Sequence, residues 1–367
     1  MMFKNKNLLI YLLLFLILWT TFFVYHKYLQ NQLKNQTKIL TSEGIDSLEK
    51  IILGGIEQWI LIRGWDRSNP VVLFLHGGPG APLFTYARDI GVDARLEQHF
   101  VMVYWEQRGT GKAFSRSIPK NSMTIEQFVS DSYELSKMLK HRFGVSKIIL
   151  VARSWGSLIG LMVVHQYPEL FYSYVGIGQM IHPLENDKIS YECAIKLAQD
   201  FGNQKAITEL KKVGYPPYGF EKLNIQRRWL TKVYRKLMAE KFNISRPSHW
   251  KKLLSTPEYT FMDILKMGFD PDFSARHLWN EEFYQINLFE QIPKIDVPVY
   301  FLAGRYDYFT PSEIVEDYYQ KLIAPNEKYL IWFKKSGHNP EREEADKFYD
   351  VMINKVLAPI YESSLKR

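Results

Sequence analysis

The chain alternates short, fully apolar runs with longer stretches in which apolar residues recur at helical spacing. Short runs rich in β-branched and aromatic residues are typical of strands buried on both faces of a sheet. Such runs occupy residues 71–75, 101–104, 148–152, 174–178, 299–303 and 329–333. Between two of them, the segment from Thr124 to Arg142 predicts an amphipathic helix with Thr124 as its N-cap. This alternation predicts an α/β fold with a mostly parallel, doubly wound sheet covered by helices on both faces.

The interval between Gly178 and Val297 is far longer than a simple crossover between parallel strands, which needs about a dozen residues or more. It is rich in helical patterns, Trp, Tyr and charged residues. We therefore expect residues 182–293 to form an inserted helical cap. The core of the protein is then formed by residues 43–181 and 294–367.

The N-terminal region has the pattern of a membrane anchor. Residues 7–25 contain no charged side chain, and about twenty apolar residues in a helix cross a bilayer core of about 30 Å. A cleavable signal peptide has a shorter apolar region followed by small residues, whereas Thr-Thr-Phe-Phe-Val-Tyr-His-Lys follows here. The sequence therefore predicts a single-pass, uncleaved anchor over 7–25, preceded by a short tail (1–6) and followed by a polar tether (26–42).

The net charge of +8 does not indicate a nucleic-acid partner. Residues 1–42 hold five lysines and no acid, which leaves 42 basic and 39 acidic residues for the rest of the chain. A nearly balanced body gives no reason to expect a phosphate-binding face. The lysines on the two sides of the apolar stretch almost cancel under the positive-inside rule. Because a very short N-terminal tail usually stays in the cytoplasm, we expect the body to be extracytoplasmic. Cys193, the single cysteine, excludes an internal disulfide.

The sequence Ala152-Arg-Ser-Trp-Gly156 is the clearest chemical motif. It directly follows the apolar run 148–152 and precedes a predicted helix over 157–166. This is the pattern of the nucleophile elbow, a tight turn between a strand and a helix in which a small residue stands two positions before the serine and a glycine two positions after it. The turn raises the serine hydroxyl above the sheet. The helix N-terminus favours negative charge that develops there. We therefore expect Ser154 to be a nucleophile.

A serine hydroxyl needs a base to take its proton. Asp307 follows the run 299–303, and His338 follows the run 329–333. Alone, either residue is more often an ordinary loop residue. Together they lie at the carboxyl ends of strands, where parallel sheets bind ligands, in the order serine, acid, histidine. The sequence thus predicts a Ser154–His338–Asp307 triad.

The sequence His76-Gly-Gly-Pro-Gly80 follows the run 71–75. Glycines let a backbone approach a ligand closely. We expect the backbone N–H groups of Gly78 and Trp155 to form an oxyanion hole. His76 is expected to be a buried orienting group rather than the base, and Arg108 is expected to hold its loop by pairing with an acid.

These motifs together resemble the proline iminopeptidase branch of the α/β-hydrolase fold. The chain carries His76-Gly-Gly-Pro-Gly80, Glu106-Gln-Arg-Gly-Thr-Gly111 with Ser115, Ser154-Trp-Gly-Ser157, Gly304-Arg-Tyr-Asp307 and Gly337-His338. The resemblance implies a serine hydrolase that cleaves small peptides or amides under a helical cap. We expect aminopeptidase activity and no metal or organic cofactor.

The sequence also departs from that family. Glu106 stands where the family has Asp, and Ala152-Arg153 where it has Gly-Gly. The family binds the substrate's α-amine with acidic side chains, some directly after the catalytic Asp, where this chain has Tyr308. Glu281 and Glu282 are weak substitutes, and they are otherwise exposed helical charges.

Two other functions remain open. An esterase, lactonase or lipid-related hydrolase acting on an ester substrate would use the same triad. A serine nucleophile argues against epoxide and haloalkane chemistry, which uses Asp. A binding protein that has lost catalysis is disfavoured because Ser154, Asp307 and His338 are all present.

Overall fold

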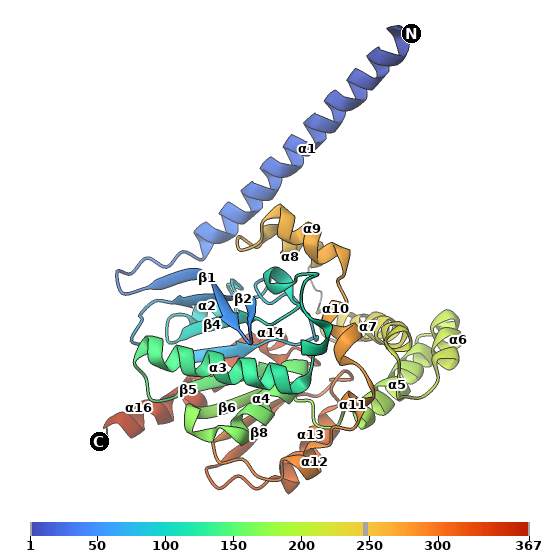
Figure 1. Ribbon diagram of the computed structural model, residues 1–367. Helices are drawn as coiled ribbons and strands as arrows, with labels where there is room; N and C mark the ends of the chain where they lie inside the picture. Colours follow the sequence, from blue (N-terminus) through green and yellow to red (C-terminus); the bar gives the residue numbers. More distant parts are fainter. Residues whose placement is uncertain (1, 245–248, 366–367) are drawn as a thin grey trace.

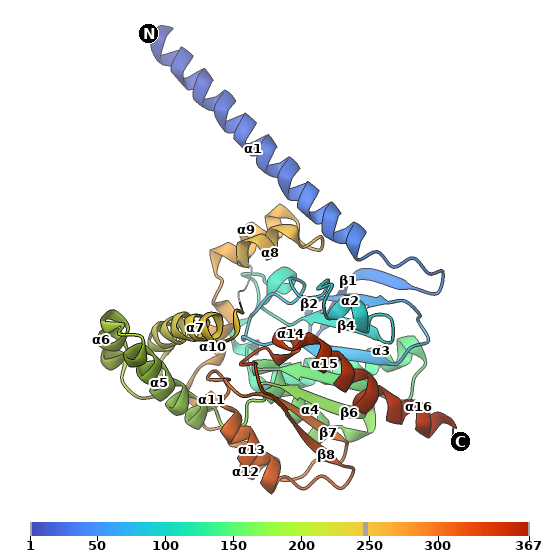
Figure 2. The same ribbon diagram turned by 180° about the vertical axis from the view of Figure 1, so that it is seen from behind.

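The computed structural model describes residues 2–244 and 249–365. They form a twisted sheet with helices on both faces, a group of helices beside one edge of it, and a long N-terminal helix that extends away from the body (Figures 1 and 2). The fold is thus the α/β architecture that the sequence predicts.

The described residues form an eight-stranded sheet with the strand order β1-β2-β4-β3-β5-β6-β7-β8. The strands are β1 (Ile45–Leu53), β2 (Ile56–Gly64), β3 (Val71–Leu75), β4 (Val101–Glu106), β5 (Ile148–Arg153), β6 (Phe171–Ile177), β7 (Val299–Gly304) and β8 (Lys328–Phe333). From β4 to β8 in this order the strands are parallel, whereas β2 is antiparallel to both of its neighbours. All of the apolar runs identified in the sequence are strands, as predicted.

The β1–β2 hairpin is an additional element that the sequence analysis did not predict. In β1, at the edge of the sheet, exposed and half-buried positions alternate between two buried ends. Asp46, Glu49 and Lys50 interrupt its apolar residues, so it lacks the continuous apolar run by which the central strands were recognised.

The helices divide between the core and the segment 182–293. The core helices are α2 (Asp93–Leu96), α3 (Ile125–Phe143), α4 (Trp155–Gln166), α13 (Ser312–Lys321), α14 (Pro340–Glu343), α15 (Ala345–Val351) and α16 (Ala358–Leu365), with a π-helical turn at Met352–Leu357. The segment 182–293 contains α5 (Pro183–Asp200), α6 (Gln204–Val213), α7 (Phe220–Phe242), α8 (His249–Ser255), α9 (Phe261–Phe269), α10 (Phe273–Leu278), α11 (Glu281–Tyr284) and α12 (Leu288–Gln291). Short 3₁₀ turns lie at Gly111–Ala113, Lys120–Ser122 and Pro168–Leu170.

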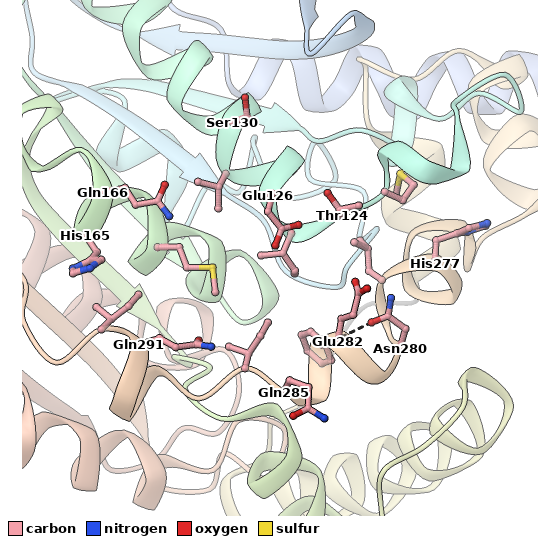
Figure 3. A pocket seen from close by; sticks show the side chains of 18 of the residues that line it. Thr124, Glu126, Ser130, His165, Gln166, His277, Asn280, Glu282, Gln285 and Gln291 are labelled. Atoms are coloured by element: carbon pink, nitrogen blue, oxygen red, sulfur yellow. Dashed lines mark hydrogen bonds between the residues drawn. The ribbon is translucent and has the colours of Figure 1, made fainter.

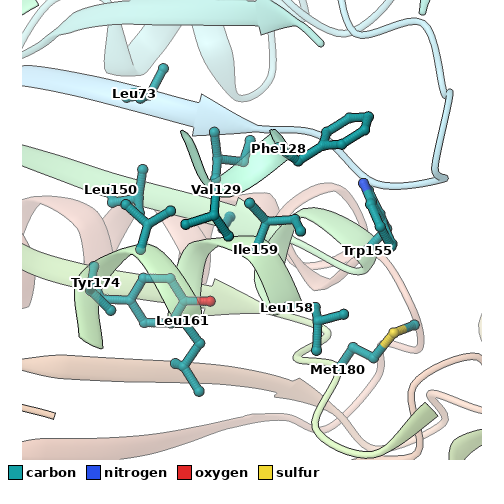
Figure 4. Close-up of a cluster of buried hydrophobic side chains, with 14 of the residues drawn as sticks. Leu73, Phe128, Val129, Leu150, Trp155, Leu158, Ile159, Leu161, Tyr174 and Met180 are labelled. Carbon is teal, nitrogen blue, oxygen red and sulfur yellow. The ribbon is translucent and has the colours of Figure 1, made fainter. Parts of the chain in front are cut away.

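Two apolar clusters hold the layers together. On one face of the sheet, α3 and α4 pack their apolar side chains against the strands (Figure 4). On the other face, α15 and the π-helical turn cover the sheet through Phe348 and Met352. The start of α3 agrees with the sequence prediction, because Thr124 is its N-cap: the Thr124 hydroxyl accepts a hydrogen bond from the backbone N–H of Gln127. Each large apolar side chain buried here stabilises the fold by about 1.5–3 kcal/mol.

The N-terminal helix is longer than predicted. Helix α1 (Met2–Gln36) runs without a break through the expected anchor and most of the expected tether. Residues 26–36 contain neither Gly nor Pro, so nothing in their chemistry ends the helix after the apolar stretch. Within the described residues, α1 is long and apolar enough to cross a membrane, judged by length and composition alone, with a mean hydropathy of 1.6 in its most apolar part.

The loop that follows β3 is held by a buried histidine. His76 Nδ1 donates to the carbonyl of Gly77 (2.7 Å), and its Nε2 accepts a hydrogen bond from the backbone N–H of Gln107 (3.3 Å). This pairing requires a neutral imidazole. Burial lowers the pKa of His76 to about 4, so the ring stays neutral at physiological pH. His76 is therefore the buried orienting group that the sequence predicts.

This histidine makes the stability of the fold depend on pH. Between pH 6.5, where a free imidazole titrates, and about 4, the unfolded chain binds a proton that folded His76 does not bind. The free energy of unfolding should therefore fall by about 3 kcal/mol as the pH falls through this window. Chemical unfolding at several pH values should show that the free energy of unfolding of His76→Gln falls less steeply with decreasing pH than that of the parent. The exposed-site variant His141→Gln should keep the parent's slope, and an unchanged slope in His76→Gln would contradict the assignment.

Candidate active site

Ser154 lies in a strained turn between β5 and α4. Its backbone has φ 53° and ψ −125°, which a residue with a side chain rarely adopts. Its N–H donates to the carbonyl of Ile177 (2.9 Å), and its own carbonyl accepts a hydrogen bond from the Ser157 hydroxyl (2.5 Å). A Cβ at Gly156 would lie 2.4 Å from the carbonyl oxygen of His76. Only glycine therefore allows this close approach of α4 to the end of β3.

The structure brings Ser154, His338 and Asp307 together at the carboxyl edge of the sheet. The Ser154 Oγ lies 3.0 Å from His338 Nε2. On the other side of the ring, Nδ1 lies 3.0 and 2.9 Å from the two carboxylate oxygens of Asp307. All three side chains thus form one continuous hydrogen-bonded chain, with each residue supplied by the loop after a different parallel strand.

The Asp307 carboxylate is fully buried and remains ionised. Burial by itself raises its pKa, but the neighbouring His338 and the hydrogen bonds from Thr310 outweigh this effect and leave the pKa below its ordinary value. The Thr310 hydroxyl donates to Oδ2 (2.8 Å), and the N–H groups of Thr310 and Phe309 donate to Oδ1 (3.0 and 2.9 Å). The charge that faces His338 is therefore fixed in place.

Two residues absent from the sequence predictions hold the histidine loop. Tyr234, from α7, accepts a hydrogen bond from the backbone N–H of His338 (3.1 Å). Arg153, directly before the serine, donates to Asn339 Oδ1, and its Nε lies 3.3 Å from Glu341. No sequence pattern marks Tyr234. Arg153 was noted only as a departure from the family's glycine.

Gly178 is a third residue that the sequence analysis did not single out. It follows β6 with φ 53°, and a Cβ there would lie 3.1 Å from Asp307 Oδ2 and 3.3 Å from His338 Nδ1. A side chain at this position would push into the hydrogen-bonded chain. A glycine directly after a predicted central strand was the available signal.

The backbone groups predicted for an oxyanion hole lie next to the serine. Gly78 lines the same cavity as Ser154, and Trp155 is the first residue of α4. The N–H of a first helical residue has no partner within its helix. The negative end of a substrate carbonyl placed between these two groups would also meet the helix N-terminus.

A cavity of about 400 Å³ opens over Ser154 and His338. Helix α7 supplies much of its lining, including the apolar side chain of Leu223, and Trp279, directly after α10, adds a second large apolar side chain. Three arginines also line it. Arg227 is paired with the buried Asp187, Arg153 is paired with Glu341, and Arg235 is exposed to solvent.

Among the described lining residues of this cavity, Asp272 is the one acid. It precedes α10, and within the described residues its carboxylate makes no hydrogen bond or ion pair. Burial raises its pKa, and the nearby Arg276 partly opposes that effect. The sequence analysis missed Asp272 because a carboxylate before a short helix is usually a cap.

The structure does not bring Glu281 and Glu282 to the triad. Both are exposed on α11, and neither lines the cavity over Ser154. Glu282 instead faces a separate cavity of about 630 Å³ between α3, α4 and α10–α12, where Glu126 and His165 also lie (Figure 3). Both glutamates lie in the segment 182–293, but their short helix turns them away from the edge of the sheet that carries Ser154.

Arg108 and Glu106 stabilise loops near the site. Arg108 forms a fully buried pair with Asp131 (2.9 Å), as predicted. The Glu106 carboxylate accepts hydrogen bonds from the backbone of Leu83 and Lys112 and from the Tyr259 hydroxyl. Glu106 therefore connects the core to the α8–α9 connection. Among the described residues no group of three or more His, Cys, Asp and Glu side chains is arranged to hold a metal ion.

Comparisons with known proteins agree with the fold and with the resemblance seen in the motifs. The chain is 33% identical over 310 residues to a Bacillus subtilis protein named probable aminopeptidase YbaC, covering 84% of this chain and 96% of that protein. It is 24% identical over 315 residues to a proline iminopeptidase of Saccharolobus solfataricus, covering 81% and 88%. The crystal structure of a proline iminopeptidase from Mycobacterium smegmatis superposes with a TM-score of 0.59 at 15% identity, covering 87% and 99%. The profile of the family described as the alpha/beta hydrolase fold matches residues 70–204. This chain therefore belongs to the α/β-hydrolase family, and its named relatives include an aminopeptidase and proline iminopeptidases.

Proposed function

We propose that the protein is a serine hydrolase that cleaves an amide bond by acyl transfer, most simply as an aminopeptidase that resembles the proline iminopeptidases. The observation that carries this proposal is the chain of hydrogen bonds from Ser154 through His338 to Asp307. A hydroxyl 3.0 Å from an imidazole nitrogen has a base in place for its proton. The core of the enzyme is formed by residues 43–181 and 294–367, and the cap by residues 182–293.

In this mechanism Ser154 Oγ attacks the substrate carbonyl while His338 Nε2 takes its proton. The same proton passes to the leaving amine, and water then releases the acyl group. Asp307 holds the imidazole in the tautomer that presents an unprotonated Nε2 and stabilises the imidazolium that forms. The N–H groups of Gly78 and Trp155 bind the oxyanion.

Asp272 is the side chain that gives this site a preference for a free amine. A protonated α-amine gains from a carboxylate in a partly buried cavity, and within the described residues Asp272 makes no hydrogen bond or ion pair that would compete with it, although the charge of Arg276 lies nearby. The charges of Arg227 and Arg153 are balanced by Asp187 and Glu341. Asp272 thus replaces Glu281 and Glu282 as the proposed amine-binding residue.

The N-terminal helix is an uncleaved membrane anchor rather than a signal sequence, with the catalytic body on the extracytoplasmic side. The apolar side chains of residues 10–18 are exposed, which a bilayer would cover. The following part of α1 is docked on the body: Gln30 is buried and donates to the carbonyls of Thr256 (2.9 Å) and Tyr259 (2.7 Å). Within the apolar stretch itself, the ring of Trp19 lies 5.1 Å from that of Phe261, and cleavage after this stretch would remove that contact.

Removal of the nucleophile provides the first test. Ser154→Ala should lower kcat for a proline arylamide by about 10⁴-fold or more and abolish covalent labelling by a fluorophosphonate. Ser130→Ala, an exposed substitution on α3, should leave both unchanged. Full activity and labelling in Ser154→Ala would refute the assigned nucleophile.

Asp307→Asn tests the role of the buried carboxylate in catalysis and in stability. It favours the wrong imidazole tautomer, so kcat should fall by about 10⁴-fold while KM changes little. Because the pKa of Asp307 is lowered in the fold, its carboxylate adds stability above about pH 3.8 and loses it as the pH falls through the lowered value. The variant should therefore have a lower free energy of unfolding at neutral pH, and this free energy should change less with pH in acid. Asp317→Asn, on the exposed face of α13, should show neither effect. A kcat close to that of the parent would contradict the proposed role.

The substrate preference is tested with three compounds: a proline arylamide, the same arylamide with a blocked amine, and a short-chain aryl ester. The free-amine amide should be cleaved best. Asp272→Asn should lower kcat/KM for it by about 10- to 100-fold, the loss expected for a hydrogen bond to a charged group, and should spare the ester. Glu282→Gln should change nothing. Ester cleavage without amide cleavage would retain the triad, reject the aminopeptidase, and favour the esterase or lipid-related alternative.

A further inference from the structure

Apolar side chains are exposed along α8 and α9. Met262 and Phe269 are each 69% exposed and Leu265 is 41% exposed on one face of α9, and Trp250 of α8 is 63% exposed beside a cavity of about 250 Å³. On the opposite face of α9, Ile264 and Met267 are buried against the core. Helix α9 is therefore apolar on both sides, which is unusual for a surface in contact only with water.

These two helices pack against α1, and both views of the molecule show them beside its lower half (Figures 1 and 2). The ring of Phe261 lies 5.1 Å from that of Trp19 and 5.7 Å from that of Phe22. One turn further along, His26 Nδ1 lies 2.8 Å from the carbonyl of Leu254. The depth of α9 relative to α1 is thus set by a series of specific contacts.

That register places α9 at the level of the membrane boundary. The uncharged stretch of α1 ends near Tyr25, and at about 1.5 Å per residue Trp19 lies about 9 Å inside it. When this stretch crosses a bilayer, Phe261, which contacts Trp19, is carried to the same depth. Amphipathic helices that lie in the interface bury their apolar face by about 5–10 Å. The contact with Trp19 therefore gives α9 the depth of an interfacial helix.

The charges around α8 and α9 permit this position. The acids of this region are each paired: Glu258 with Arg88, Asp263 with Lys112, and Asp270 with Arg276. Arg116 lies over the ring of Phe269 at 4.9 Å, a combination of cation and aromatic ring that suits a lipid headgroup region. These three carboxylates therefore keep their partners when the surface meets anionic lipid.

We propose that α8 and α9 form a second membrane-contact surface, which inserts Trp250, Met262, Leu265 and Phe269 into the lipid interface beside the protein's own anchor. The occupant is the bilayer rather than a second copy of the chain, because one bilayer covers both the exposed apolar residues of α1 and this adjoining surface. The proposal rests on the proposed anchor. Since α9 leads through Asp270 and Pro271 to Asp272 and α10, docking would hold the catalytic cavity close to the membrane surface.

The test measures lipid contact in the full chain. In a Cys193→Ser background, single cysteines replace Met262 or Phe269 and carry an environment-sensitive fluorophore. Matched controls replace Tyr215 or Ile323, which are 60% and 59% exposed and lie in other parts of the chain, and Leu14→Cys reports on the anchor. The proteins are reconstituted into vesicles of equal parts phosphatidylcholine and phosphatidylglycerol, with a lipid nitroxide quencher near the headgroups. Thermal unfolding verifies that each variant is folded.

We expect the fluorophores at 262 and 269 to be quenched by lipid several-fold more strongly than those at 215 and 323. If Leu14 is quenched but 262 and 269 behave like the controls, the contact surface is refuted while the anchor stands. If Leu14 is not quenched, the anchor fails and this inference fails with it. If 262 and 269 are shielded from aqueous iodide, are not quenched by lipid, and cross-link between copies, a protein interface replaces the bilayer. The triad variants test catalysis separately.

Discussion

The close approach of the β5–α4 turn to the end of β3 is the constraint on which the site depends. The left-handed backbone of Ser154 costs about 1–3 kcal/mol. It is retained because Gly156 packs directly on the carbonyl oxygens of Leu75 and His76, which leave no room for a Cβ. Since β3 and β5 are paired in parallel, this contact also fixes the glycine loop after β3 against the serine. The contact of Gly156 with the end of β3 therefore positions both Ser154 and the backbone groups beside it.

The histidine is positioned from two sides. Its ring is oriented by Asp307, while its backbone is held by Tyr234 of α7 and its loop by Arg153 at the end of β5. The Gly337 N–H next to it donates to Glu343 (2.7 Å). Side chains from the segment 182–293 and from the sheet region therefore both fix the position of the His338 loop.

The sequence predicts the residues that directly follow the parallel strands, but not those that depend on how the helices of the segment 182–293 pack. Ser154, Asp307 and His338 each follow an apolar run, and parallel pairing then brings the ends of those runs to one edge, so sequence order alone predicts their meeting. Asp272 and Tyr234 belong to helices whose packing angles no local pattern encodes. For the same reason Glu281 and Glu282 could be placed in the cap region but not on one of its faces. The extension of α1 to Gln36 could have been inferred from the absence of helix-breaking residues, but hydropathy, which marked the anchor, falls at Tyr25.

The end of α1, the sheet region and the α8–α9 connection meet in one buried ionic network. Arg63 donates to the carbonyl of Thr37 at the end of α1 and pairs with Glu97. Arg88 contacts the Thr37 hydroxyl, and it also pairs with Glu258 of the α8–α9 connection. Breaking one member of a buried network leaves an uncompensated charge and costs about 3–5 kcal/mol. The end of α1 and the α8–α9 segment therefore move as one unit with the core. Glu106 also joins this segment to the loops beside the cavity over Ser154. The orientation of α1 is therefore fixed relative to the orientation of that cavity.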